Sequence, residues 1–206
     1  MHISEGVLSA PVLISSGALA AAGTAIGLKK LDYDRIAQAG ILAAAFFVTA
    51  LIHVPIGPAN AHLILNGLVG LLLGWAAFPV ILVALVLQAM LFQFGGITAL
   101  GANTIIMALP AVICSLLFSR FLHKRPLLAH SAAFACGFLS VSLSAIILGL
   151  ALVFTEENFF EVSAIVIVAH IPVMIIEGSV TAICVAFLKK VQPTMLAGFS
   201  RHDQSR

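Results

Sequence analysis

The chain has 206 residues, of which 62% are hydrophobic and 9% are charged, and its net charge is +2. So few charged residues cannot cover a soluble surface, since ordinary domains carry about 25%. The small net charge gives no indication of a nucleic-acid partner, so we expect none. We therefore expect an all-α, polytopic protein of the lipid bilayer, with a single transmembrane domain over residues 1–206 and a short polar tail at about 191–206.

Seven apolar runs predict seven transmembrane helices, because about 20 apolar residues in a helix cross a hydrocarbon core of ~30 Å. The third and fourth runs are marginal in length, so six spans with a re-entrant pair is the alternative count. In chain order the runs cover about residues 8–28, 36–53, 61–77, 79–94, 101–122, 128–154 and 160–188.

The basic residues predict the orientation of the helices. Lys and Arg occur between the first and second runs, between the fifth and sixth, and after the seventh. With seven spans these three locations share one side, which the positive-inside rule makes cytoplasmic. The N-terminus is then outside and the C-terminus is cytoplasmic, whereas six spans would place the basic clusters on both sides.

The chain begins MHISEG, which places His2 next to the amino terminus. The α-amine of Met1, the amide nitrogen of His2 and Nδ1 of the His2 ring can form fused chelate rings around a divalent metal. Three nitrogens in one plane with an open fourth position suit Ni²⁺ or Cu²⁺, and Co²⁺ binds more weakly. The alternative is that His2 is an incidental polar residue at a chain end.

A second histidine is expected on the same side of the membrane as His2. His62 falls in the predicted first turn of the third span and is a candidate fourth nitrogen ligand. Asn66 lies four residues further on, hence on the same helix face. His53 ends the second span on the same side. The alternative for each histidine is an interfacial residue that bonds water or a carbonyl group.

A third outer segment, LQAMLFQFGGITALGANT, covers residues 87–104. Its Gly-Gly pair allows a non-helical loop that would fold over the outer site. Gln93 and Asn103 are then candidates to support the ligands by hydrogen bonds. A plain turn with capping residues is the alternative.

The last span contains two ionisable residues, His170 and Glu177, seven positions apart and therefore on one helix face. Pro172 should kink or loosen this helix. Ionisable residues inside a membrane mark functional sites by default. We favour a structural or coupling role, with a proton or metal relay as the alternative.

Four segments, MHISEG, PIGPANAHLILNGLVGLLLG, LQAMLFQFGGITALGAN and AHIPVMIIEG, resemble the signature segments of the CbiM/NikM proteins. These are the substrate-capture (S) components of energy-coupling-factor transporters for cobalt and nickel. The resemblance implies a seven-helix protein of a bacterial or archaeal plasma membrane, with its N-terminus inserted from the outer side. It implies that the transported Ni²⁺ or Co²⁺ is held by the Met1 amine, the His2 amide and imidazole nitrogens, and His62.

The same resemblance implies partners, namely a transmembrane coupling (T) subunit and two cytoplasmic ATPase subunits. Any small accessory membrane subunit would be a separate chain. The sequence has no GxxxxGK[ST] phosphate loop, so we expect ATP hydrolysis in the partners and no enzyme activity in this chain. The alternatives are an intramembrane enzyme, for which no GxSxG or HExxH motif is present, and a heptahelical receptor or haem protein that uses His53, His130 and His170.

Overall fold

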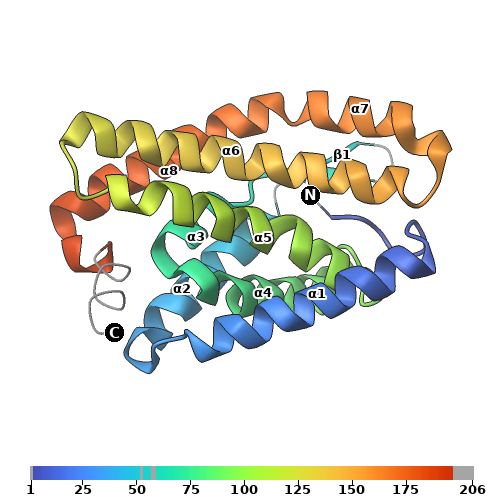
Figure 1. Cartoon of the computed structure of the whole chain (residues 1–206), viewed down its shortest axis with the longest axis horizontal. Helices are drawn as coiled ribbons and strands as arrows, with labels where there is room; N and C mark the ends of the chain where they lie inside the picture. The colour runs from blue at the N-terminus through green and yellow to red at the C-terminus, as the bar shows by residue number, and fades with distance from the viewer. Residues whose placement is uncertain (1, 52, 57–58, 197–206) are drawn as a thin grey trace.

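The structure, a computed structural model, describes residues 2–51, 53–56 and 59–196. The fold is helical, as expected, with one short β-hairpin between the second and third helices (Figure 1). The helices are α1 (Ala10–Lys29), α2 (Ile36–Thr49), α3 (Asn66–Leu73), α4 (Ala77–Phe92), α5 (Leu100–Phe118), α6 (Pro126–Val153), α7 (Phe160–Ala169) and α8 (Ile171–Val191); the hairpin strands are β1 (His53–Ile56) and β2 (Ala59–His62).

Within the described residues, five helical stretches are long and apolar enough to cross a membrane. Large apolar side chains such as Ile14, Met90 and Ile183 lie exposed on the outside of the bundle. A soluble protein rarely exposes so much contiguous apolar surface, and a lipid environment explains it. The five stretches are Ala10–Lys29, Asn66–Phe92, Leu100–Phe121, Pro126–Val153 and Phe160–Val191.

The stretch from Asn66 to Phe92 reverses direction, so it is not a single straight span. His62 precedes α3 and Gln88 lies near the end of α4, yet both form hydrogen bonds to His2. The reversal occurs at Gly74, which begins a short 3₁₀ turn (Gly74–Ala76), and Trp75 of this turn lies beside Lys30 just after the end of α1. The chain thus returns to the level of the hairpin along α4.

The last helical stretch is interrupted where a proline removes a main-chain donor. α7 ends at Ala169 and α8 begins at Ile171, with Pro172 in the first turn of α8. Proline has no N–H to continue the helical hydrogen bonds, which is why it is tolerated in a first turn. The expected loosening of this span at Pro172 is therefore present, and His170 lies at the junction.

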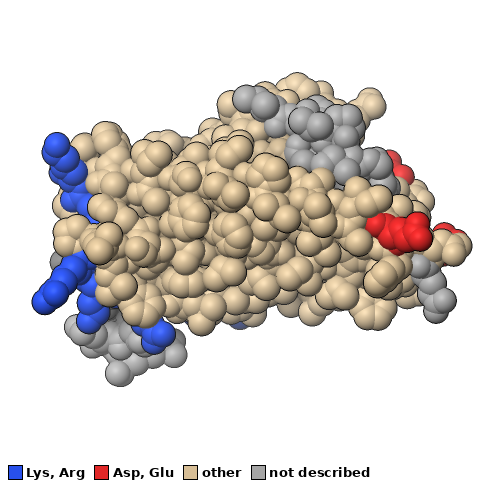
Figure 2. Space-filling model, turned by 90° about the horizontal axis from the view of Figure 1, so that it is seen from above, with Lys and Arg blue, Asp and Glu red and all other residues tan. Residues whose placement is uncertain are grey.

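Charged residues gather at the two ends of the bundle. On the face that Figure 2 shows, Lys and Arg lie at one end and Asp and Glu at the other. At the basic end, two side chains form hydrogen bonds between separate segments of the chain. Arg35 donates to the carbonyls of Leu72 and Met195, and Lys189 donates to the carbonyl of Leu122. The first part of the predicted polar tail therefore packs against the bundle, and residues 197–206 lie outside the described residues.

Three helices cross in close contact at two glycines. A Cβ atom at Gly137 of α6 would lie 2.6 Å from the main-chain oxygen of Glu177 in α8, and one at Gly67 of α3 would lie 2.7 Å from Cα of Gly137. Small residues allow membrane helices to approach backbone to backbone. This crossing brings the middle of α8 against the start of α3.

Candidate metal site

The N-terminal segment is held in the bundle by one side chain from α5. Asn103 accepts a hydrogen bond from the main-chain N–H of Ile3 at 2.8 Å and donates one to its main-chain oxygen at 3.1 Å. Both residues are buried. A side-chain amide that pairs with both main-chain groups of one residue acts like a neighbouring strand, so Asn103 fixes the direction in which the chain enters the bundle.

A second contact closes over the same segment from the loop between α4 and α5. The Glu5 carboxylate accepts hydrogen bonds from the main-chain N–H of Thr98 at 3.0 Å and from its hydroxyl at 3.3 Å. The bond from the Thr98 N–H lowers the pKa of Glu5. Gly95 has a φ of 78°, and a Cβ there would lie 2.6 Å from the Asn103 amide. The predicted loop therefore does lie over the N-terminal segment, and Gly95 permits its close approach.

His2 and His62 are stacked against one another in the interior. Their ring centroids are 4.7 Å apart with 29° between the planes, and Nδ1 of His2 lies 3.0 Å from Nε2 of His62. Both side chains are no more than 3% exposed. Two residues 60 positions apart are thus brought together as the sequence predicted.

The other nitrogen of each ring is already used as a donor. Nδ1 of His62 donates to the Leu63 carbonyl at 2.7 Å, and Nε2 of His2 donates to Oε1 of Gln88 at 2.7 Å. The Gln88 amide is oriented by a bond from its Nε2 to the Phe47 carbonyl at 3.4 Å. A neutral imidazole carries one N–H, so the two nitrogens that face each other both present lone pairs.

The two facing imidazole nitrogens would be stabilised by a positive charge between the rings. Two lone pairs at 3.0 Å repel each other unless a proton or a metal ion lies between them. Burial holds the pKa of His62, which lies in the hairpin outside the five candidate spans, well below its ordinary value. A proton is therefore disfavoured there, and neutral imidazole is the form that binds metals.

The distance also fits two neighbouring ligands of one ion. Metal–nitrogen bonds are roughly 2.0 Å long, so two nitrogens at 90° around a metal are about 2.8 Å apart. The 3.0 Å between the imidazole nitrogens is close to that value. Among the described residues, no group of three or more His, Cys, Asp and Glu side chains could hold a metal. The remaining ligands of a four-coordinate ion would then be other groups, such as main-chain nitrogens.

Gln93 and Asn66, which were predicted to support the metal ligands, form no hydrogen bonds to the two histidines within the described part of the chain. Gln93 is exposed after the end of α4 with a left-handed φ of 57°, and Gln88 takes the position on His2. Gln88 faces inward from the last turns of α4, whereas Gln93 already belongs to the loop. The signal for Gln88 was present in the sequence, as a lone polar residue inside an apolar helix.

The prediction that Asn66 shares a helix face with His62 is wrong, because His62 lies in β2 and α3 begins only at Asn66. Asn66 is instead buried between three helices. It donates to the Met107 carbonyl of α5 and to Ser144 of α6, and accepts from Ser140 of α6.

Met1, the predicted source of the amine ligand, lies outside the described residues, so its role stays a prediction. His53 is the cross-strand partner of His62 in the hairpin. The register places the main chain of position 53 opposite that of His62, and the His53 side chain lies outside what the structure describes.

His170 and Glu177 are both buried. Nδ1 of His170 donates to the Val166 carbonyl at 2.6 Å, within its own helical stretch. Glu177 contacts the chain that follows His62, because it accepts hydrogen bonds from the N–H groups of Ile64 and Leu65. Of the two ionisable residues, Glu177 is the one in hydrogen-bond contact with the segment that carries His62.

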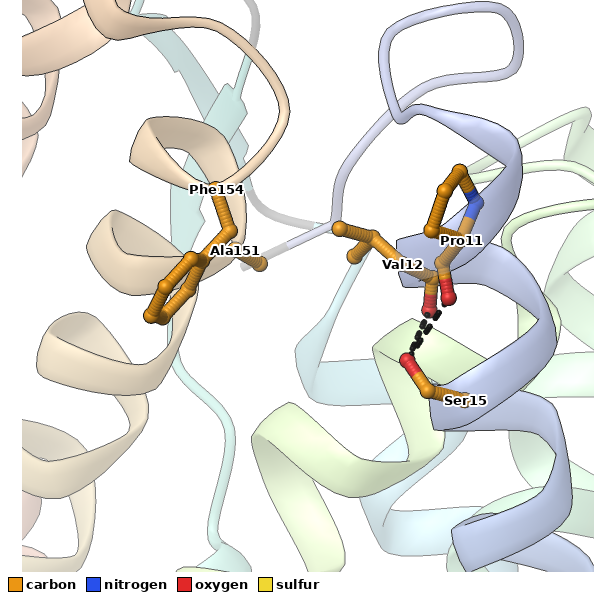
Figure 3. A pocket seen from close by; sticks show the side chains of 5 residues that line it. All are labelled: Pro11, Val12, Ser15, Ala151 and Phe154. Atoms are coloured by element: carbon orange, nitrogen blue, oxygen red, sulfur yellow. Dashed lines mark hydrogen bonds between the residues drawn. The ribbon is translucent and has the colours of Figure 1, made fainter.

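The groove between the start of α1 and the end of α6 is a poor alternative site. Pro11, Val12, Ala151 and Phe154 line it with apolar groups (Figure 3). The hydroxyl of Ser15, its one polar side chain, donates to the carbonyls of Pro11 and Val12 in its own helix. The groove therefore offers no nitrogen or carboxylate ligand.

Comparison with known proteins shows the family. The family described as "Cobalt uptake substrate-specific transmembrane region" matches residues 2–195. The chain belongs to the CbiM family. The cobalt transport protein CbiM of Kyrpidia tusciae is 32% identical over 96% of this chain and 86% of its own length. A "putative metal transport protein" of Haemophilus influenzae is 39% identical over 95% of this chain and 97% of its own length.

A solved structure has the same fold as this CbiM-family chain. The crystal structure of a transition metal transporter superposes with a TM-score of 0.82 at 28% identity, and the match covers 99% of this chain and all of that one. The resemblance read from the sequence is confirmed. Because the relatives are transport proteins, they point to a multi-pass transporter component for cobalt or nickel rather than an enzyme.

Proposed function

We propose that this chain is the substrate-capture component of an energy-coupling-factor importer, and that it binds Ni²⁺ or Co²⁺ at an outward-facing site. The observation that carries the proposal is the pair of facing lone pairs on Nδ1 of His2 and Nε2 of His62, 3.0 Å apart. Buried imidazoles whose second nitrogens donate to fixed acceptors are oriented as metal ligands are. Borderline nitrogen ligands of this kind suit late divalent metals.

The remaining two ligands in the proposed site are the α-amine of Met1 and the amide nitrogen of His2. These atoms form chelate rings with Nδ1 of His2, which leaves one in-plane position for His62. That position is adjacent to Nδ1 of His2, in agreement with the short distance between the two rings. A planar, four-nitrogen site favours Ni²⁺ among the first-row metals that these transporters carry.

The proposed orientation places the histidine pair on the outer side of a plasma membrane. The basic end of the bundle would be cytoplasmic by the positive-inside rule. Seven passes would be made by α1, α2, the two legs of the stretch from Asn66 to Phe92 on either side of the reversal at Gly74, α5, α6, and α7 together with α8. A coupling subunit and two ATPases would bind from the membrane and the cytoplasm and supply the ATP hydrolysis.

Titration of the purified chain with metal ions tests the capture step. We expect one Ni²⁺ or Co²⁺ per chain with a Kd of about 1 µM or below, and no competition by Mg²⁺, which prefers oxygen ligands. Uptake of radioactive nickel by cells should then require this chain together with the coupling subunit and the ATPases. A chain that shows no saturable binding of either ion would contradict the proposal.

Asn103 should be essential for the site although it is not a ligand. Asn103→Ala removes both bonds to Ile3 and leaves a buried N–H and carbonyl unpaired, at a cost of about 1–3 kcal/mol each. We expect Ni²⁺ affinity to fall by roughly 10–100-fold, as for other supporting residues of metal sites. Thr104→Val is the matched control, because the neighbouring Thr104 hydroxyl donates only to Leu100 in its own helix. Equal affinities of the two variants would show that Asn103 does not hold the N-terminal segment.

A further inference from the structure

A buried carboxylate lies directly behind the segment that carries His62. Glu177 is fully buried in α8, and one of its oxygens, Oε1, accepts hydrogen bonds from the N–H of Ile64 and, at 2.8 Å, from that of Leu65. Its other oxygen, Oε2, has no partner among the described residues. Burying a carboxylate is costly unless it makes hydrogen bonds, so the two main-chain bonds account for its place here.

The carboxylate accepts from the N–H of the N-cap residue of α3 and from that of the residue before it, at a helix start that has no side-chain cap of its own. Leu65 stands at the N-cap position with a left-handed φ of 56° and provides no side-chain cap. A left-handed residue other than glycine costs about 1–2 kcal/mol, and the first N–H groups of a helix need outside acceptors. Glu177 provides an acceptor from another helix, and a negative charge is favourable at this end of α3.

One rigid peptide group links this cap to the metal site. The N–H of Ile64 and the carbonyl of Leu63 belong to the same peptide unit, which is planar, so the two groups point in opposite directions. The N–H donates to Glu177, and the carbonyl accepts from Nδ1 of His62 at 2.7 Å. The orientation that Glu177 imposes on the peptide therefore sets the direction of the His62 ring.

We propose that Glu177 is a positioning residue for the metal site: its carboxylate holds the Leu63–Ile64 peptide so that the His62 ring turns Nε2 toward His2. The proposal rests on the proposed function, since it assumes that His62 is a ligand. The close crossing at Gly67 and Gly137 brings Glu177 to this peptide. Glu177 thus acts through His62, and its own oxygens do not touch the ion.

Metal binding by three variants tests the proposal. Glu177→Leu should weaken Ni²⁺ binding by roughly 10–100-fold. It should also shift the Ni²⁺ absorption band to longer wavelength, as we expect for His62→Ala, because water would replace an imidazole nitrogen. Glu177→Gln keeps an oxygen that accepts both N–H groups, so its affinity should stay within about tenfold of wild type. Thr181→Val, one helical turn further on the same buried face, is the control and should bind as wild type does.

A double variant separates positioning from a general structural role. If Glu177 acts through His62, Glu177→Leu should weaken binding no further, within about twofold, when it is added to His62→Ala. An equal loss in both backgrounds would overturn the proposal. So would a Glu177→Gln affinity as low as that of Glu177→Leu, because the charge rather than the hydrogen bonds would then matter.

Nitrogen NMR of the metal-free protein gives a readout that does not depend on metal binding. We expect the His62 ring to be a single tautomer with the proton on Nδ1 in the wild type and a mixture in Glu177→Leu. The His62 signal is assigned by its loss in His62→Ala. A wild-type protein that binds no Ni²⁺ but shows this change would refute the proposed function and leave the positioning role standing. An unchanged tautomer in Glu177→Leu would refute the positioning role.

Discussion

Adding three glycines before Met1 is expected to weaken Ni²⁺ binding by at least about 100-fold, or about 2.8 kcal/mol. A single added residue would not serve, because a Gly-Met-His terminus can itself chelate Ni²⁺ through its amine, two amide nitrogens and the imidazole. The extension converts the α-amine of Met1 into an amide, which removes the terminal nitrogen of the proposed chelate. It also adds three residues beside His2 and Ile3, which are both buried in the bundle. Isothermal titration of the extended and wild-type proteins measures the difference.

The control for the extension is the same three glycines added after Arg206, which should leave the affinity unchanged. Both proteins should have the same melting temperature, since the helices do not depend on the amine. A near-normal Kd for the N-terminally extended protein would show that the amine is not a ligand. The histidine pair would then need its other ligands from elsewhere in the chain.

The second large effect is expected for His62→Ala. Loss of this imidazole removes one of the four proposed ligands, so we expect a loss of at least about 100-fold in Ni²⁺ affinity, the upper limit for residues that only support ligands. The His2 ring keeps its bond to Gln88, so the remaining chelate can still hold Ni²⁺ weakly. Titration measures the affinity, and the Ni²⁺ absorption band should move to longer wavelength.

His130→Ala is the matched control for His62→Ala. His130 lies in the second turn of α6, which starts beside Arg125 at the basic end of the bundle, and it is half-buried. The change removes an imidazole of the same size far from the proposed site, so the affinity should stay at the wild-type value. Equal losses in the two variants would mean that the effect comes from destabilised helices rather than from a lost ligand.

The residues of the histidine pair could be identified from the sequence because their signals are local. A histidine next to a chain terminus is a chelator by its own chemistry, and a second histidine on the same side of the membrane follows from the distribution of basic residues. The bonds from Thr98 to Glu5 agree with the prediction that the loop after α4 folds over the N-terminal segment. Each of these inferences needs only residue type and side of the membrane.

The supporting residues were harder to identify because their partners are distant along the chain. Gln88 rather than Gln93 contacts His2, which is 86 residues away. The position of Gln88 inside an apolar helix indicates a buried polar group but does not indicate its partner. The prediction for Asn66 failed because it assumed that the helix already includes His62. The left-handed Leu65 delays the start of α3, and the cap that allows this comes from Glu177 on another helix.

Residue chemistry and spacing were enough to establish an apolar helical bundle, its family and the two histidines that meet in it. These properties depend on hydrophobic runs, on charge placement and on short motifs, all of which are visible in the amino-acid sequence. The tertiary structure alone decided which nitrogen of each ring faces the other and which carboxylate holds the peptide behind His62. The orientation of the rings and the contact of the carboxylate depend on packing between helices that cross at small residues. Such contacts between distant segments produce no periodic pattern in the sequence.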